Sequence, residues 1–164
     1  MGGKPIKVLL IENNPKDAAR LRKLLAPPRQ FRLTARRSLG KGLAILQNKP
    51  FDIVLLDLSL PDSQGVDTFD KVHAQAPETP VVILLGPKQD RTEALAALRG
   101  GAQDYLIKGK TGRDLLQRII SDAIERQSVY LKLERYAKEL LHSDLQLRSI
   151  IEKNADGIII GTCQ

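Results

Sequence analysis

The chain has 164 residues, of which 42% are apolar and none is tryptophan, and its formal net charge is +7. This length suits one domain of about 100 to 150 residues with an extension, and the apolar share argues against intrinsic disorder. The longest apolar runs, at 53–56, 81–85 and 158–160, are far shorter than the ~20 residues of a membrane-spanning helix, and a single cysteine, Cys163, excludes an intrachain disulfide and favours a reducing compartment, the cytoplasm.

The positive charge is concentrated in residues 18–51, which contain no acidic residue. The nine basic residues of this segment are Arg20, Arg22, Lys23, Arg29, Arg32, Arg36, Arg37, Lys41 and Lys49. Such a segment could attract nucleic acid, an anionic membrane surface or an acidic protein, although most charged runs are simply solvated faces. No recognition helix or aromatic stacking pattern accompanies the charge, which argues against a nucleic-acid partner.

Short β-rich runs alternate with helical patterns along the first two thirds of the chain. Strands are predicted at 6–11, 31–36, 52–57, 80–85 and 104–107, and helices at 14–25, 39–47, 64–75, 91–99 and from Thr111 onward. The third and fourth strands are almost wholly apolar, as expected of parallel strands that are covered on both faces. The alternation predicts an α/β fold in which helices join parallel strands.

A helical pattern without glycine or proline extends from Arg113 to Asp156. Steps of four and three residues along it mark an apolar seam. The seam consists of Ile119, Ala123, Arg126, Tyr130, Leu133, Ala137, Leu140, Asp144, Leu147 and Ile151. This pattern favours an extended coiled coil and therefore a homodimer. The alternative is a helix that ends near Gln127 and a second helix that folds back on the domain.

The last residues, RSIIEKNADGIIIGTCQ, interrupt the helical pattern at Asp156-Gly157. The apolar run 158–160 is predicted to form a strand, for which no partner strand remains in this chain. We therefore expect residues 152–164 to be the truncated start of a further domain or a disordered tail.

Side chains with useful chemistry follow the predicted strands. Glu12 and Asn13 follow the first strand, Asp57 ends the third, and Lys108 follows the fifth. In open parallel sheets function gathers beyond the carboxyl ends of the strands. Oxygen ligands there suit Mg²⁺, an ammonium group suits the oxygens of a transferred phosphoryl group, and Asp57 could act as a nucleophile.

Three stretches, IKVLLIENNP, FDIVLLDLSLPDSQGVDTF and TPVVILLG…ALRGGAQDYLIKG, resemble in order and spacing the receiver domain of two-component response regulators, over residues 5 to about 127. The resemblance implies a doubly wound, flavodoxin-like, five-stranded parallel sheet in the order 2-1-3-4-5. It implies that Asp57 is the phosphoacceptor, that Lys108 contacts the phosphoryl group and that Tyr105 is the aromatic residue of the switch. It also implies Mg²⁺ as the cofactor, with Glu12, Asn13, Asp57 and the backbone carbonyl of Ser59 as ligands.

Two positions depart from the pattern of that family. Asn13 replaces the second acid after the first strand, and because a carboxamide brings no charge, the affinity for Mg²⁺ should be weakened. Leu85 replaces the Ser or Thr that ends the fourth strand, so the hydroxyl half of the switch is missing.

The resemblance implies a signalling domain, not an enzyme. It would accept a phosphoryl group on Asp57 from a histidine kinase or phosphotransfer protein and pass the change through the long helix. The alternative is a degenerate, phosphate-independent receiver that serves as a dimerisation and docking module, which Asn13 and Leu85 favour.

The domain organisation follows from the same resemblance. Residues 1–127 form the receiver domain, residues 128–151 a coiled-coil signalling helix, and residues 152–164 the truncated start of another domain. The stretch LRSIIEKNADGIII is similar to the opening of a PAS sensor domain. The whole protein is therefore expected to be a multidomain sensory protein.

Overall fold

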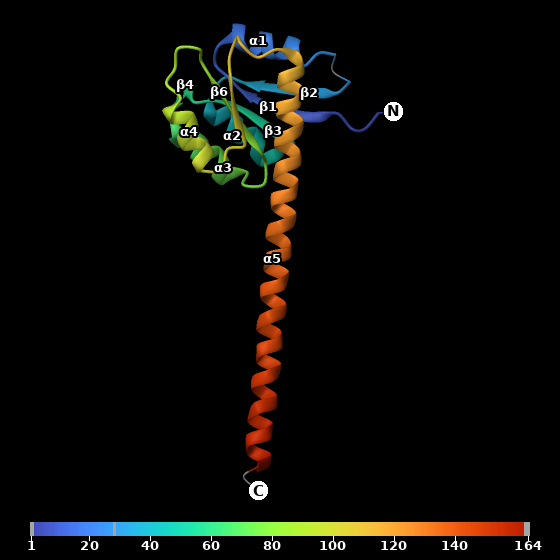
Figure 1. Cartoon of the computed structure of the whole chain (residues 1–164). Helices are drawn as coiled ribbons and strands as arrows, with labels where there is room; N and C mark the ends of the chain where they lie inside the picture. The colour runs from blue at the N-terminus through green and yellow to red at the C-terminus, as the bar shows by residue number, and fades with distance from the viewer. Residues whose placement is uncertain (1, 28, 163–164) are drawn as a thin grey trace. The chain divides into compact units, whose positions relative to one another are not determined.

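The computed structural model describes residues 2–27 and 29–162, except for the side chains of 156–162. The chain divides into two compact units, Met1–Gln127 and Ser128–Gln164. The first unit contains one parallel sheet in the order β2-β1-β3-β6-β7, which confirms the predicted flavodoxin-like order (Figure 1). Its strands are β1 (Ile6–Ile11), β2 (Phe31–Arg36), β3 (Ile53–Asp57), β6 (Val81–Leu85) and β7 (Asp104–Ile107).

Helices cover both faces of this sheet. Neighbouring residues of each strand point to opposite faces, and both faces carry apolar side chains that the helices bury. Leu9 and Ile11 of β1 face α2 (Leu39–Asn48), α3 (Val66–Gln75) and α4 (Thr92–Arg99). Val8 and Leu10 face α1 (Pro15–Leu24) and the first turns of α5 (Arg113–Thr162). Every residue of β3 and β6 is buried, as the predicted apolar runs required.

Side-chain caps fix the starts of two helices near the carboxyl ends of the strands. The Asn14 side chain accepts hydrogen bonds from the N–H groups of Lys16 and Asp17, so Asn14 is the N-cap of α1. At the start of α2, the carboxylate of Asp62 accepts from the N–H groups of Leu39 and Gly40 at 2.9 Å each.

A small hairpin that the sequence pattern did not predict follows β3. It pairs β4 (Ser59–Leu60) with β5 (Ser63–Gln64) in antiparallel fashion. Strands of two residues carry no detectable alternation, and this explains why the predicted helix began at residue 64. Gly65 follows with φ of 74°, a backbone conformation that favours glycine, and α3 starts directly after it.

The helix α5 continues without interruption past Gln127 and through Thr162. The predicted strand at 158–160 is therefore wrong. A strand without a partner would leave its N–H and C=O groups unpaired, whereas a helix satisfies them internally; the cost of Gly157 inside a helix is only about 1 kcal/mol. Residues 163 and 164 lie outside the described part of the chain.

The basic segment 18–51 contains most of α1 and all of β2 and α2, and β2 is an edge strand of the sheet. Among the described residues, its Lys and Arg side chains form no ion pair with an acidic side chain.

No described helix has an apolar stretch long enough to cross a membrane.

Candidate functional site

Lys108 lies between the carboxylates that end the first and third strands. Its Nζ atom is 2.7 Å from Glu12 Oε2 and 3.0 Å from Asp57 Oδ2. The sheet register explains this convergence, because Ile11 pairs with Leu56 and Leu85 pairs with Ile107, so that the following residues all lie at one edge. The three side chains that the sequence analysis combined into one site are therefore in direct contact.

A fourth charged side chain, which the sequence analysis missed, belongs to this group. Asp17 Oδ2 lies 3.6 Å from Lys108 Nζ. Asp17 stands in the first turn of α1, three residues after the Asn14 cap. The acidic residue beside a cap was a usable signal, since α1 begins at the same edge of the sheet as the site.

These residues line an open pocket of about 510 Å³. Its lining residues are Glu12, Asn13, Asn14, Asp17, Asp57, Ser59, Gly86, Pro87, Lys88, Gln89, Lys108 and Gly109. Five of the predicted site residues are among them, whereas Leu85 and Tyr105 are not. The loop after β6 contributes Lys88 and Gln89, which the sequence analysis also missed.

The environment of Glu12 differs from that of an ordinary surface carboxylate. The residue is only 2% exposed, and this burial raises its pKa to about 7, although the contacts with Lys108 and with the N–H group of Asn14 oppose the rise. Glu12 Oε2 forms no hydrogen bond with the described residues beyond its ion pair with Lys108. Glu12 can therefore gain or lose a proton near neutral pH.

Lys108 responds to the same surroundings in the opposite way. Burial lowers the pKa of its ammonium group, but the adjacent carboxylates of Glu12 and Asp57 outweigh burial and raise the pKa above its ordinary value. The ammonium group therefore stays charged over the whole neutral range. Asp57 Oδ1, on the far side of that carboxylate, accepts a hydrogen bond of 2.9 Å from the N–H group of Ser59.

The two asparagines after Glu12 have different surroundings. Asn14 caps α1 with its side chain. Asn13 is exposed and lines the pocket, and its backbone carbonyl accepts a hydrogen bond of 3.4 Å from Arg37. Both residues line the pocket, but the side-chain oxygen of Asn14 is engaged by the N–H groups of α1, whereas no hydrogen bond of the Asn13 side chain is found among the described residues.

The end of β6 carries no polar side chain. Leu85 is 4% exposed and packs in the core on the α2, α3 and α4 side of the sheet, and the partly buried Tyr105 packs against the same core. The N–H of Gly86, the residue after the strand, donates a hydrogen bond of 2.7 Å to the side chain of Gln89.

The donor atoms of the pocket fit a hard divalent cation in kind. Glu12 and Asp57 offer carboxylate oxygens, Asn13 a carboxamide oxygen and Ser59 a backbone carbonyl, and oxygen atoms are the ligands that Mg²⁺ prefers. The buried Glu12 Oε2, which has no hydrogen-bond partner among the described residues apart from the ammonium group of Lys108, is consistent with such a ligand. The set is poor in charge, because the described residues contain no group of three or more His, Cys, Asp or Glu side chains placed to hold a metal.

Comparisons with known proteins agree with this geometry. The model of the response regulator receiver domain matches residues 8–120. The TorCAD operon transcriptional regulatory protein TorR of Escherichia coli O157:H7 is 31% identical over 116 residues, which are 70% of this chain and 49% of TorR. The nitrate/nitrite response regulator protein NarL of Escherichia coli K12 is 26% identical over 69% of this chain and 52% of NarL. The chain thus spans about half the length of such curated relatives.

Solved structures show the same fold. A CheY-like response regulator receiver domain protein from Methanospirillum hungatei JF-1 has a TM-score of 0.67 at 23% identity, over 77% of this chain and 98% of that one. The receiver domain of the sensor histidine kinase PA1611 from Pseudomonas aeruginosa PAO1 has a TM-score of 0.64 at 26% identity, over 74% of this chain and 98% of that one. The latter structure has a magnesium ion coordinated in its active site cleft.

Proposed function

The chain belongs to the response regulator receiver domain family, and from that premise we propose that it accepts a phosphoryl group on Asp57 from a histidine kinase or a phosphotransfer protein. Receiver domains are signalling modules of two-component systems that a histidine kinase typically phosphorylates on an aspartate. The observation that carries the proposal is the contact of 3.0 Å between Lys108 Nζ and Asp57 Oδ2 inside an open pocket.

In the proposed reaction, an oxygen of the Asp57 carboxylate forms a bond to phosphorus. The bond between phosphorus and the histidine nitrogen of the donor breaks, and its electron pair stays on that nitrogen, which later takes a proton from water. Such transfer depends mostly on positioning and charge neutralisation. Lys108 supplies a fixed positive charge next to the attacking carboxylate, and the neighbouring carboxylates keep its ammonium group protonated.

We propose Mg²⁺ as the cofactor, held by Glu12, Asn13, Asp57 and the backbone carbonyl of Ser59. When bound, the ion would neutralise charge on the phosphoryl oxygens. The magnesium ion in the related PA1611 receiver supports this assignment. Asn13 contributes no charge, so the affinity is proposed to be weaker than that of a site with three carboxylates.

A second candidate function is a degenerate receiver that docks and dimerises independently of phosphate. Leu85 favours it, because the strand end that would carry a switch hydroxyl is buried and apolar. Tyr105, the proposed aromatic of the switch, is packed against the same core. Asp57 and Lys108 favour the first candidate, since their contact is intact.

We also propose how the receiver is connected to the rest of the protein. Residues 1–127 would be the receiver, 128–151 a coiled coil that joins two copies and carries the change onward, and 152–164 the start of a PAS-like domain in a multidomain sensory protein. The unbroken helix α5 supports the middle part of this proposal. The predicted strand, which was part of the resemblance to a PAS domain, is absent from the described residues 158–160.

Incubation with Mg²⁺ and a small phosphodonor such as acetyl phosphate tests the first candidate. We expect the intact protein to gain the mass of one phosphoryl group, and the Asp57→Asn variant to gain none. The opposite result would be no mass gain with acetyl phosphate and no spectral change with beryllofluoride, even at high Mg²⁺ concentration. If the variant Asn13→Asp/Leu85→Thr did respond under the same conditions, the docking module would be the better description.

A further inference from the structure

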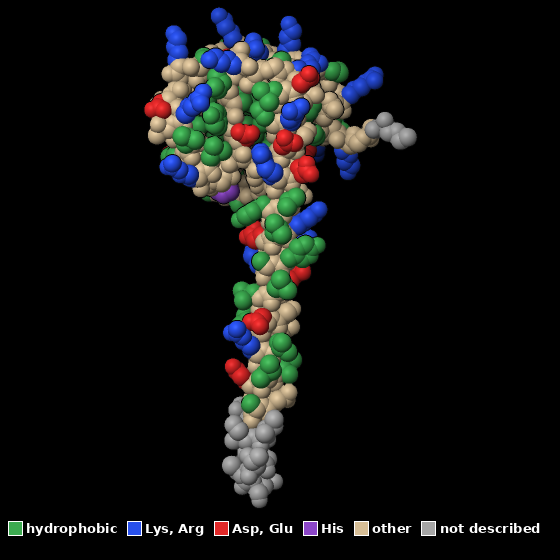
Figure 2. Space-filling view, in the orientation of Figure 1, with side chains coloured by type: hydrophobic (Ala, Val, Ile, Leu, Met, Phe, Trp, Pro, Cys, Tyr) green, Lys and Arg blue, Asp and Glu red, His purple; other side chains and the backbone are tan. Residues whose placement is uncertain are grey.

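The second unit has many exposed apolar side chains on α5. The large ones range from 49% to 72% exposed, and Figure 2 shows such side chains at the surface of this part of the helix. They are Val129, Tyr130, Leu133, Tyr136, Leu140, Leu141, Leu145, Leu147, Ile150 and Ile151. Exposed apolar surface of this extent is unfavourable in water, and such surfaces mark contacts with a partner.

The first three positions of the predicted seam are already used inside the receiver. Ala123 is fully buried in the core beside α1, and Ile119 packs against that core. Arg126 donates a hydrogen bond of 3.3 Å to the carbonyl of Gln103 and lies 3.9 Å from the carboxylate of Asp104. Ala123 and Ile119 therefore pack inside the receiver and not against a partner, and these three positions no longer fix the phase of the seam beyond Gln127.

Beyond Gln127 the seam can follow two courses. Leu133, Leu140 and Leu147 stand seven residues apart and belong to both. One course adds the residues four before or three after each leucine, which are Val129, Tyr136, Ser143 and Ile150. The other adds the residues three before or four after, which are Tyr130, Ala137, Asp144 and Ile151. Both satisfy the alternating steps of a coiled coil.

Charge decides between the two courses. The second would bury Asp144 of one copy against Asp144 of the other, and buried like charges without a cation are strongly unfavourable. Asp144 instead pairs with Arg148 on its own helix at 3.2 Å, with both side chains at least half exposed. The first course contains no charge, because its polar member is Ser143, whose hydroxyl can bond to the backbone of its own helix.

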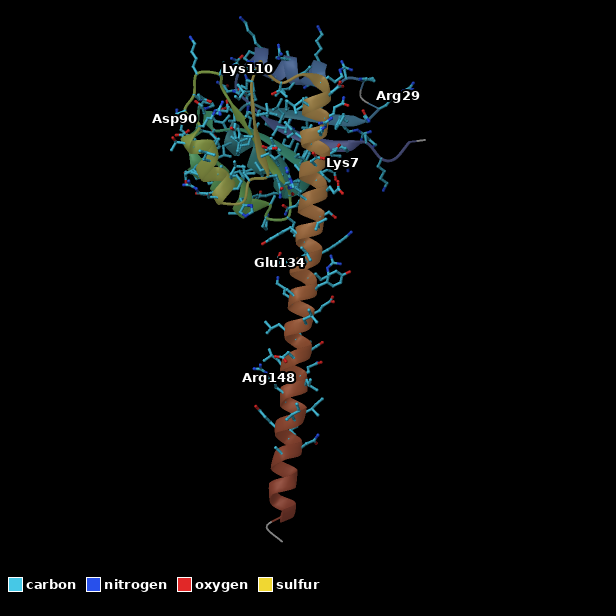
Figure 3. All side chains as sticks on the ribbon, in the orientation of Figure 1. Lys7, Arg29, Asp90, Lys110, Glu134 and Arg148 are labelled. Carbon is cyan, nitrogen blue, oxygen red and sulfur yellow. The ribbon has the colours of Figure 1, made fainter. Side chains whose placement is uncertain are left out.

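The other ion pair of this segment agrees with the first course. Glu134 and Lys138 are 3.5 Å apart, and they follow Leu133 by one and five positions. In a heptad in which Leu133 is position a, these are positions b and f, on the face opposite the seam. Figure 3 shows Glu134 and Arg148 extending outward from the helix. One cost remains at the rim, where Glu139 of one copy approaches Asp144 of the other, but salt screens exposed charges.

We propose that two copies of this chain pair in parallel and in register through the seam Val129, Leu133, Tyr136, Leu140, Ser143, Leu147 and Ile150. This deepens the dimer of the proposed function and rests on it. A second copy is the occupant that a seven-residue repeat fits, since each level of the seam meets the same residue of its partner. The parallel orientation follows from the proposed onward signal, which requires both C-terminal ends to leave in the same direction.

Single-cysteine variants in a Cys163→Ser background test the register. Val129→Cys, Tyr136→Cys, Ser143→Cys and Ile150→Cys should form disulfide-linked dimers several-fold faster under mild oxidation than the matched variants at Tyr130, Ala137, Asp144 and Ile151, because a disulfide needs closely placed β-carbons. The opposite preference overturns the register. A mixture of the Val129→Cys and Ile150→Cys proteins tests the orientation. Disulfides that join position 129 of one copy to position 150 of the other, without disulfides between identical positions, overturn the parallel orientation.

Light scattering tests the pairing itself. The double variant Leu133→Lys/Leu140→Lys should have the mass of a monomer. The variant Leu141→Lys/Leu145→Lys, which changes two leucines outside the seam that are also more than half exposed, should remain a dimer. A monomeric wild-type protein, or equal effects of the two variants, overturns the proposal. Acetyl phosphate labelling of Asp57 in the same variants separates this from the proposed function, because labelling depends on the pocket and cross-linking on the seam.

Discussion

Lys108 Nζ is held between Glu12 Oε2 at 2.7 Å and Asp57 Oδ2 at 3.0 Å, so a single, largely buried ammonium group is the shared counter-charge of two buried carboxyl groups. This relationship connects stability with function in the receiver. The same side chain that is proposed to assist phosphoryl transfer also keeps two acids compatible with a buried position. Changes at the site should therefore affect folding as well as signalling, and the two effects can be measured separately.

Removal of the Lys108 charge should destabilise the protein strongly. Lys108→Met leaves Glu12 and Asp57 buried without their cation, and we expect a loss of about 3 kcal/mol in the free energy of unfolding, measured with urea. Lys71→Met is the matched control. It breaks the exposed pair with Asp67, at 3.0 Å, and should cost less than about 0.5 kcal/mol. Similar losses in the two variants would contradict the role of burial.

Stability should depend on pH through Glu12. Its pKa rises from an ordinary 4.5 to about 7 on folding, so the folded state binds the proton more tightly than the unfolded chain. The contribution of Glu12 to stability is therefore greatest below pH 4.5 and declines as the pH rises toward about 7. Glu12→Gln cannot titrate, and its urea midpoint should decline less over this interval. Parallel pH profiles of the two proteins would exclude a raised pKa.

The two neighbouring asparagines should respond differently to the same substitution. Asn13→Asp places a carboxylate in the pocket, and we expect Mg²⁺ to bind at least about tenfold more tightly by calorimetric titration. Asn14→Asp is the control, because its side chain caps α1 and an aspartate keeps that cap. If both variants gained affinity equally, general attraction by negative charge would explain the result, and Asn13 would not be a ligand.

The hydroxyl missing from β6 should be costly to restore. Leu85→Thr removes apolar volume from the core and adds a buried polar group, and we expect a loss of about 2 kcal/mol in stability. Leu95→Thr changes a leucine of α4 that is 44% exposed and should cost under about 1 kcal/mol. Thermal unfolding of the two variants gives the comparison. A stable Leu85→Thr protein would show that this strand end tolerates a hydroxyl.

The sequence predicted much of the sheet because periodicity and punctuation were strong there. The strands at Ile6–Ile11, Phe31–Arg36 and Asp104–Ile107 have the predicted bounds, and β3 and β6 each begin one residue later than predicted. Parallel strands end at one edge, and for that reason Glu12, Asp57 and Lys108 could be combined before their contacts were known. Their metal-binding and switch roles, and those of Asn13, Ser59, Leu85 and Tyr105, stay predictions.

What the sequence did not predict depends on tertiary context. The pattern placed Asp17 near the same edge of the sheet, but it could not show the contact with Lys108, because that contact depends on how α1 packs on the sheet. The seam through Ile119 and Ala123 was misassigned for a related reason. A helix face that packs on a sheet and one that packs on another helix have nearly the same apolar period, and only the structure separates them.

The strand β7 has only four residues, and each of its ends is tied to a different part of the receiver. Lys108 follows it and contacts the carboxylates. At its beginning, the Gln103 side chain donates a hydrogen bond of 2.8 Å to the buried Gln127, and Arg126 pairs with Asp104. Only the four residues of β7, each paired with a residue of β6, lie between these two sets of contacts. If the proposed phosphoryl group displaced Lys108, the displacement would therefore be passed along this strand to the contacts that hold Arg126 and Gln127.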